Sequence, residues 1–264
     1  MISPEQKPTL QRKADELLRL HTSNEILKVV NVWDAVSAKV VADISETTAL
    51  ATASHSIAAL FGYEDGEKIP LDLMLDMVGR IVASTSLPVS ADLEAGYGDP
   101  GETIRRAIGV GVVGANLEDQ MKPFDESVAA VAAAVAAAEA EGVGFVLNAR
   151  TDAFRRSGGL SHDEQVTEAI RRGRAFLDEG AACVFVPASL DVPTVERLVD
   201  GIGQQRVSVI GVPGSLRPSA LETLGVARIS YGPWSQRVAL TALADLAVSV
   251  YGDGALPDNT RALN

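Results

Sequence analysis

The sequence predicts an α/β fold, a (β/α)8 barrel of the triosephosphate isomerase type with one extra helix at its N-terminus. Short apolar runs alternate with helical stretches along the 264 residues. Eight such runs in about 250 residues match the count and size of this barrel. The runs are almost continuously apolar, as parallel strands buried on both faces should be. A doubly wound open sheet is the alternative, but no Gly-x-Gly-x-x-Gly follows the first run.

The predicted elements follow one another in a regular order. Residues 1–22 are expected to form a helical extension ahead of the barrel, and 1–264 a single domain. The expected strands are 28–32, 49–53, 88–92, 114–118, 144–149, 182–186, 207–210 and 227–231. The clearest helices are expected at 71–84, 100–110, 126–141, 163–179 and 193–201. Gly142, Gly180 and Gly225 stand where helices should stop. About 30 residues follow Gly232, which predicts a C-terminal segment too short for a long exchanged helical arm.

Composition and charge restrict the classes of partner. A hydrophobic content of 47% suffices for one large core. No apolar run approaches the ~18 residues of a membrane span, and residues 1–21 lack the apolar core of a signal peptide. The net charge of −12 argues against nucleic acid or an anionic membrane as partner. The single cysteine, Cys183, excludes an internal disulfide and fits a reducing compartment. We therefore expect a cytoplasmic protein with a small-molecule partner.

Two carboxylates, Asp92 and Glu94, end the third expected strand just before a glycine-rich loop. Residues i and i+2 share one face of a strand, so both acids are expected to point the same way. Two neighbouring buried carboxylates need a cation or a proton to offset their repulsion. A divalent metal held by oxygen ligands is the simplest explanation. The alternative is a salt bridge to a neighbouring arginine.

Further polar residues are expected at the same end of the barrel, where the chemistry of this fold takes place. Glu118 ends the fourth strand and can converge with Asp92 and Glu94 on one cation. Oxygen ligands without His or Cys favour Mg²⁺, with Mn²⁺ as a substitute, over zinc. Arg150 ends the fifth strand and has the planar fork that suits a substrate carboxylate or phosphonate. Arg150 can alternatively be a structural partner of the acids, and Asp119 and Asp152 can be helix N-caps.

In this order, these residues resemble the isocitrate lyase/phosphoenolpyruvate mutase superfamily. The matching stretches are 31–35, 62–66, 90–98, 114–119 and 148–152. The resemblance implies a (β/α)8 barrel, a Mg²⁺ ion, and an oxo- or hydroxy-acid substrate that passes through an enolpyruvate-like species. It also implies a homo-oligomer, because relatives assemble through their C-terminal helices.

The resemblance also assigns roles to individual residues. Asp92 matches the direct metal ligand, and Asp65, Glu94 and Glu118 match positions that hold the metal mainly through water. Backbone amides around Ala53, Ser54 and His55 match the loop that binds the substrate carboxylate. Arg150 matches the arginine at the substrate's departing or migrating end. Trp33 matches an aromatic wall of the pocket, although an ordinary core tryptophan is the alternative.

The chain departs from the lyases of the superfamily at several points. The segment 118–126 is short and lacks the cysteine-containing gating motif of those lyases. Cys183 lies in an apolar strand and is expected to be an inert core residue. Lyases carry Glu on strand 6 and Asn on strand 7, where this chain has 184–187 and 210–214 without either residue. His55 replaces a small residue and can act as acid or base, or can pack outward.

Two classes of function follow. The first is a Mg²⁺-dependent enzyme, similar to phosphoenolpyruvate phosphonomutase, that cleaves or rearranges a C–C or P–C bond in a small 2-oxo or 2-hydroxy acid. Arg150, Asp65 and His55 are its candidate catalytic residues. Oxaloacetate hydrolysis or decarboxylation and methylisocitrate-type cleavage are the alternative reactions. The second class is a catalytically silent oxo-acid-binding module, which the missing gating loop favours.

Overall fold

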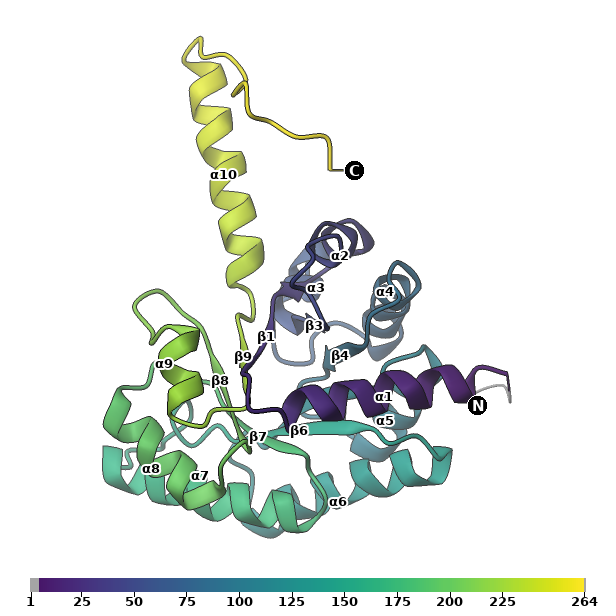
Figure 1. Cartoon of the computed structure of the whole chain (residues 1–264), viewed down its shortest axis with the longest axis vertical. Helices are drawn as coiled ribbons and strands as arrows, with labels where there is room; N and C mark the ends of the chain where they lie inside the picture. Colours follow the sequence, from purple (N-terminus) through teal and green to yellow (C-terminus); the bar gives the residue numbers. More distant parts are fainter. Residues whose placement is uncertain (1–4, 264) are drawn as a thin grey trace.

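The computed structural model describes residues 5–263 and confirms the predicted barrel (Figure 1). All strand pairs are parallel, in the order β1-β9-β8-β7-β6-β5-β4-β3-β2. The strands are β1 (Leu27–Val29), β2 (Asn31–Val32), β3 (Leu50–Thr52), β4 (Val89–Asp92), β5 (Gly114–Glu118), β6 (Val146–Arg150), β7 (Cys183–Val186), β8 (Val207–Ile210) and β9 (Arg228–Ser230). Their ends lie within two residues of the predicted ones.

The first predicted strand is divided into two short strands, and this division closes the barrel. β1 pairs with β9, and β2 pairs with β3, so one chain segment joins both edges of the sheet. Asn31 strengthens the closure, because its Oδ1 accepts from the backbone N–H of Tyr231 and Gly232 at 2.7 and 2.8 Å. Its Nδ2 donates to Thr52 O at 2.8 Å. One side chain thus holds the C-terminal ends of β9 and β3 together.

Helices alternate with the strands around the barrel. They are α1 (Lys7–His21), α2 (Ala35–Ala42), α3 (Ser54–Leu60), α4 (Leu71–Ala83), α5 (Pro100–Gly109), α6 (Phe124–Glu141), α7 (His162–Asp178), α8 (Val192–Ile202), α9 (Pro218–Thr223) and α10 (Trp234–Tyr251). The five predicted helices are confirmed to within two residues. The three glycines expected to stop helices all have positive φ, as the predicted stops require.

Helix α1 lies at the N-terminal end of the strands, opposite to the end where chemistry is expected. Leu17 of α1 packs so closely on Gly114, the first residue of β5, that a Cβ at this glycine would lie 2.7 Å from it. His21 and Arg228, at the start of β9, are also buried there, with His21 Nε2 3.5 Å from Arg228 Nη1. This end is therefore closed by packing, which leaves the C-terminal ends of the strands for a site.

The C-terminal helix α10 corrects the expectation of a short segment after Gly232. Its 18 residues correspond to about 27 Å of helix, and it projects away from the barrel (Figure 1). Val238, Leu243, Val248 and Tyr251 on this helix are 69%, 60%, 75% and 90% exposed. No other element within residues 5–263 covers these apolar side chains.

The interior of the barrel contains the expected apolar core. Two clusters of buried side chains, one around Leu50 and Ile81 and the other around Val184 and Leu198, fill the space between strands and helices. Cys183 is buried, and burial raises the pKa of its thiol to about 12, which confirms an inert core residue. Within residues 5–263, no helix combines the length and the apolar character that crossing a membrane would require.

Candidate functional site

Asp92 is the last residue of β4 and is held by the end of the neighbouring strand β3 and the start of α3. Its Oδ2 accepts from the Ser54 hydroxyl at 2.7 Å and from the Ser54 backbone N–H at 3.2 Å. Its own N–H donates to Thr52 Oγ1 at 2.9 Å. No hydrogen bond to Asp92 Oδ1 occurs among residues 5–263, and Asp92 lines a pocket of about 330 Å³. The structure therefore fixes one carboxylate oxygen and leaves the other for a ligand.

Glu94 does not share a strand face with Asp92, so that part of the prediction was wrong. β4 ends at Asp92, and Glu94 follows in a turn with φ +51°. Gly96 tightens the same turn at φ +89°, where a Cβ would lie 2.7 Å from the Cα of Pro100. The Glu94 carboxylate accepts from the Glu67 backbone N–H and, at 3.2 Å, from the Tyr97 hydroxyl.

The electrostatics of Glu94 nevertheless connect it with the other acids. Burial, together with the charges of Asp92 and Asp65, raises its pKa to about 7. The side chain is only 3% exposed. Three carboxylates therefore repel one another at this edge of the barrel, and a bound cation would relieve that repulsion.

Glu118 and Arg150 end adjacent strands and pair with each other. They are register partners on β5 and β6, and Arg150 Nη1 lies 2.6 Å from Glu118 Oε2. The pKa of Glu118 is raised to about 7, because the effect of burial outweighs the lowering by the charge of Arg150. Arg150 also donates from Nε to Asp152 Oδ1 at 2.8 Å, and its Nη2 lies 2.7 Å from the same oxygen. A guanidinium has five N–H groups, so each terminal nitrogen of Arg150 keeps a second N–H for a ligand.

Asp119 and Asp152 do not cap helices, so the alternative role considered for them from the sequence was wrong. Asp119 Oδ1 accepts from the backbone N–H of Asp152 and Met121, at 2.9 and 3.0 Å. Its Oδ2 accepts from Arg172 Nη1 at 3.1 Å. Helix α6, which follows Asp119, begins after Pro123 instead. Both acids therefore belong to a buried ion network that stands behind Arg150.

The pocket at the C-terminal end of the strands brings five of the predicted site residues together. They are Ser54, His55, Asp65, Asp92 and Arg150. His55 is half-buried, and its Nδ1 is buried without a hydrogen-bond partner among residues 5–263. The structure thus places His55 in the pocket wall rather than packed outward. Asp65 is an exposed side chain of the same wall.

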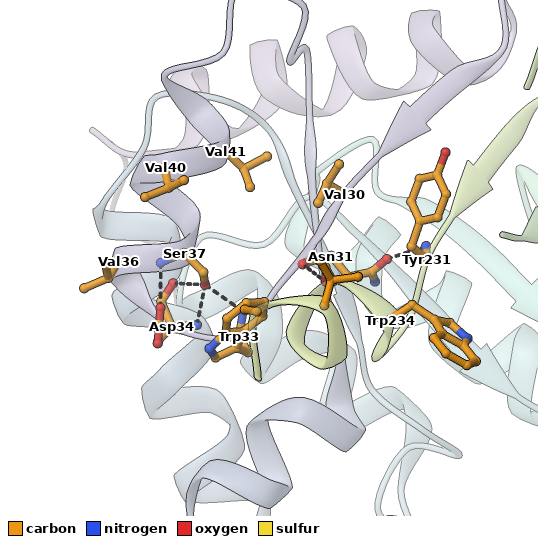
Figure 2. Close-up of a pocket in the computed structure, with 13 residues that line it drawn as sticks. Val30, Asn31, Trp33, Asp34, Val36, Ser37, Val40, Val41, Tyr231 and Trp234 are labelled. Atoms are coloured by element: carbon orange, nitrogen blue, oxygen red, sulfur yellow. Dashed lines mark hydrogen bonds between the residues drawn. The ribbon is translucent and has the colours of Figure 1, made fainter. Parts of the chain in front are cut away.

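Four predicted residues do not line this pocket. Ala53 is buried at the start of α3, and Glu94 and Glu118 lie behind Asp92 and Arg150 with the partners described above. Trp33 lines a separate apolar groove of about 610 Å³ between α2 and the base of α10 (Figure 2). It shares that groove with valines of α2, and it is not among the residues that line the pocket with Asp92.

Sequence reasoning missed several residues of the pocket, most notably Arg155, Trp234 and Arg237. Arg155 lies in the loop after β6, and the other two belong to the first turn of α10. The sequence signal for Arg155 was its place three residues after Asp152 in a strand-end loop. For Trp234 and Arg237, a strand-end signal was also present, because both follow closely after β9, which ends at Ser230.

The donor set fits a hard divalent cation that takes most of its ligands from water. Within the described chain, no three Asp, Glu, His or Cys side chains lie together closely enough to form a metal site of their own. Asp92 is the acid with an oxygen left for direct contact, and the nearby carboxylates can accept from metal-bound water. Mg²⁺ commonly keeps several waters and uses one or two carboxylates. The residues present therefore fit Mg²⁺, or Mn²⁺ in its place.

The chain is similar to several known proteins of one family. Residues 17–251 match the phosphoenolpyruvate phosphomutase family profile. An uncharacterised protein of Mycobacterium tuberculosis is 30% identical over 90% of each chain. The 2,3-dimethylmalate lyase of Eubacterium barkeri is 26% identical over 91% of this chain and 86% of its own length. The crystal structure of a Burkholderia cenocepacia J2315 protein, provisionally called a phosphonomutase, superposes with a TM-score of 0.84 at 38% identity, covering 89% of this chain and 99% of that one.

Proposed function

The chain belongs to the phosphoenolpyruvate phosphomutase family of the isocitrate lyase/phosphoenolpyruvate mutase superfamily, and we propose that it is a Mg²⁺-dependent enzyme acting on a small 2-oxo or 2-hydroxy carboxylic acid. The reaction that we propose cleaves or rearranges a C–C or P–C bond beside the carboxylate through an enolpyruvate-like species. One observation carries this proposal. Asp92, with one oxygen uncommitted, and Arg150, with two N–H groups uncommitted, line the same pocket.

Each residue of the pocket has a definite task in this proposal. Ser54 orients Asp92, and a Mg²⁺ ion bound there would supply positive charge that stabilises a developing enolate. Arg150 binds the departing or migrating anionic group and stabilises its charge, because it is already held in place by Glu118 and Asp152. Asp65 holds water near the cation from the exposed side of the pocket.

His55 is the group that we propose to move a proton in place of the missing lyase cysteine. Its ring lines the pocket, and its Nδ1 has no partner among the described residues. An imidazole has one ring nitrogen that can donate a proton and one that can accept it, as a general acid or base requires. The wall after β7 and β8 offers Pro187, Ile210 and Val212 instead of acid or amide side chains. These apolar residues exclude water but cannot transfer a proton.

The experiment that tests the proposed function is a turnover screen with the full chain in Mg²⁺. The candidate substrates are phosphonopyruvate, phosphoenolpyruvate, oxaloacetate, methylisocitrate and isocitrate, and the products followed are pyruvate, oxalate, glyoxylate and succinate. Turnover that requires Mg²⁺ and disappears in Asp92→Ala would support the proposal. Its product would separate phosphonomutase chemistry from oxaloacetate hydrolysis or decarboxylation and from methylisocitrate-type cleavage. Tight Mg²⁺-dependent oxalate binding without any turnover would favour the silent binding module.

We further propose that the enzyme is a homo-oligomer held together by α10. One chain carries both exposed apolar side chains along α10 and an apolar groove at the base of this helix (Figures 1 and 2). The groove is lined by Trp33, Tyr231, Trp234 and valines of α2. An exposed apolar surface of this extent marks an interaction site, and a second copy offers the matching helix. The single, buried Cys183 supports a reducing, cytoplasmic location.

A further inference from the structure

We infer that Arg155 and Arg237 act together with Arg150 to bind the second anionic group of the substrate, a carboxylate or phosphonate at the end remote from Asp92. This inference rests on the proposed function, because it concerns the same pocket. It adds two specificity-determining residues to the pocket.

Arg155 reaches the pocket through a turn that follows β6. The carbonyl oxygen of Asp152 accepts from the backbone N–H of Arg155 and Arg156, at 2.9 and 2.8 Å. The two arginines then differ. Arg156 Nε lies 3.4 Å from Asp152 Oδ2, whereas Arg155 is exposed and lines the pocket. The turn therefore uses one arginine for the buried acid and presents the other to a ligand.

Arg237 reaches the pocket from the first turn of α10. Its guanidinium carbon lies 4.7 Å from the centre of the Trp234 ring, and both residues line the pocket. Stacking on an aromatic face orients a guanidinium and leaves its N–H groups, which lie in the guanidinium plane, available for hydrogen bonds. The side chain is thus held in position without an acidic partner.

Neither arginine has its charge offset by an acid of the described chain. Within residues 5–263, no ion pair involves Arg155 or Arg237, whereas Arg150 in the same pocket is paired with two acids. The chain as a whole carries a net charge of −12. Two unpaired arginines in one pocket of such an acidic protein form a local site for an anion.

The order of the strands separates this cationic side from the acidic side. Asp92 ends β4 and Asp65 follows α3, whereas the arginines follow β6 and β9. β7 and β8 lie between β6 and β9, so the wall between the two arginines is uncharged, with Pro187, Ser189, Ile210 and Val212 among its lining residues. A ligand with one acid group at the Asp92 side and a second anionic group between the two arginines fits this arrangement. The cavity of about 330 Å³ limits it to a small molecule.

The test compares pairs of probes that differ in the distal anionic group. Malate and lactate share the 2-hydroxy acid, but only malate has the second carboxylate, and phosphonopyruvate and pyruvate form the corresponding pair for a phosphonate. Calorimetric affinities in Mg²⁺ would be measured for the wild-type chain, for Arg155→Gln, for Arg237→Gln and for the double variant. Oxalate, which is too short to span the pocket, is the reference ligand. Arg12→Gln, an exposed residue of α1 outside the pocket, controls for the change in net charge.

We expect one of the two longer probes to bind at least about tenfold more tightly than its partner, and the double variant to remove most of this difference. The affinity for oxalate should stay the same in all variants. The identity of the favoured probe then distinguishes a distal carboxylate from a distal phosphonate. If the longer probes have no advantage, or if the advantage survives in the double variant, the inference is overturned. Failure of the wild-type chain to bind oxalate in Mg²⁺ would instead overturn the proposed function, which separates the two failures.

Discussion

Arg150 and Asp152 lie two residues apart at the end of β6, and one oxygen of Asp152 contacts both Nε and Nη2 of Arg150, at 2.8 and 2.7 Å. Asp152 has no exposed surface, and its own backbone N–H is held by Asp119. The orientation of the arginine therefore depends on buried acids that a ligand never touches. Asp152 and Asp119 thus form a rigid support behind the pocket that keeps the Arg150 guanidinium in position for a ligand.

Replacing Asp152 by Asn should disturb Arg150 without removing any pocket residue. Asn keeps the shape but loses the charge that orients the guanidinium, so we expect Mg²⁺-dependent oxalate affinity to fall about tenfold. Calorimetry would measure this, with Asp76→Asn, an exposed ion pair with Arg80, as the control. An unchanged affinity would show that Glu118 alone suffices to position Arg150.

Replacing Asp92 by Ala should abolish Mg²⁺-dependent oxalate binding and leave the fold intact. The side chain of Asp92 contacts Ser54 at the edge of the barrel rather than the apolar core, so the melting temperature should change little. Asp125→Ala, an exposed acid in the first turn of α6, is the matched control. Undiminished binding in Asp92→Ala would refute the metal assignment.

Replacing Arg150 by Lys should weaken oxalate binding by at least about tenfold. A single ammonium cannot contact Glu118, Asp152 and a dianion with the geometry of a planar fork. The affinity of Arg150→Lys, measured beside the exposed control Arg105→Lys, decides this point. If both variants bind as the wild type does, Arg150 has only a structural role.

The stability of the fold should depend on pH through His21. Burial, together with the nearby Arg228, lowers the pKa of His21 to about 3. The unfolded chain binds a proton here below about pH 6.5 and the folded chain does not, so this contribution to stability is complete above pH 6.5 and declines as the pH falls. At pH 5, the free energy of unfolding should have lost about 2 kcal/mol relative to pH 7 from this group.

Urea unfolding of the wild type and of His21→Leu at both pH values would measure the contribution of His21. The comparison cancels the opposite effect of Glu94 and Glu118, whose raised pKa values favour the folded state as the pH falls. His162→Gln, on the exposed start of α7, should behave as the wild type does. An equal pH slope in His21→Leu would contradict the prediction.

Acidic residues on the exposed apolar face of α10 should dissociate the proposed oligomer. Leu243→Asp combined with Val248→Asp places two charges where an apolar partner surface is expected, and burying them would be costly. Analytical ultracentrifugation should then show a monomer of about 28 kDa. Thr241→Asp, an exposed polar position of the same helix, is the control. A wild-type chain that is already monomeric would rule out assembly through α10.

The sequence predicted the order and the ends of the strands because local patterns encode them. Apolar runs of four to six residues, interrupted by helices and glycine stops, are visible without any tertiary information. The same patterns did not reveal that the first strand is divided at Val30, because the pairing of β1 with β9 joins residues about 200 positions apart. They also did not reveal that α10 leaves the barrel, since its apolar residues alone do not distinguish a packed helix from a projecting one.

For the site, the sequence by itself determined which chemical groups stand at the strand ends, because parallel strands of a barrel bring these ends to one rim. Only the tertiary structure decided which of those groups enter the pocket. The left-handed turn at Glu94 takes this acid behind Asp92, and ion pairs hold Glu118 behind Arg150. Arg155 enters the pocket from a loop and Arg237 from the first turn of α10, and the course of both segments depends on long-range contacts. Side-chain direction in a turn follows from backbone dihedrals and packing, which periodicity along the chain does not encode.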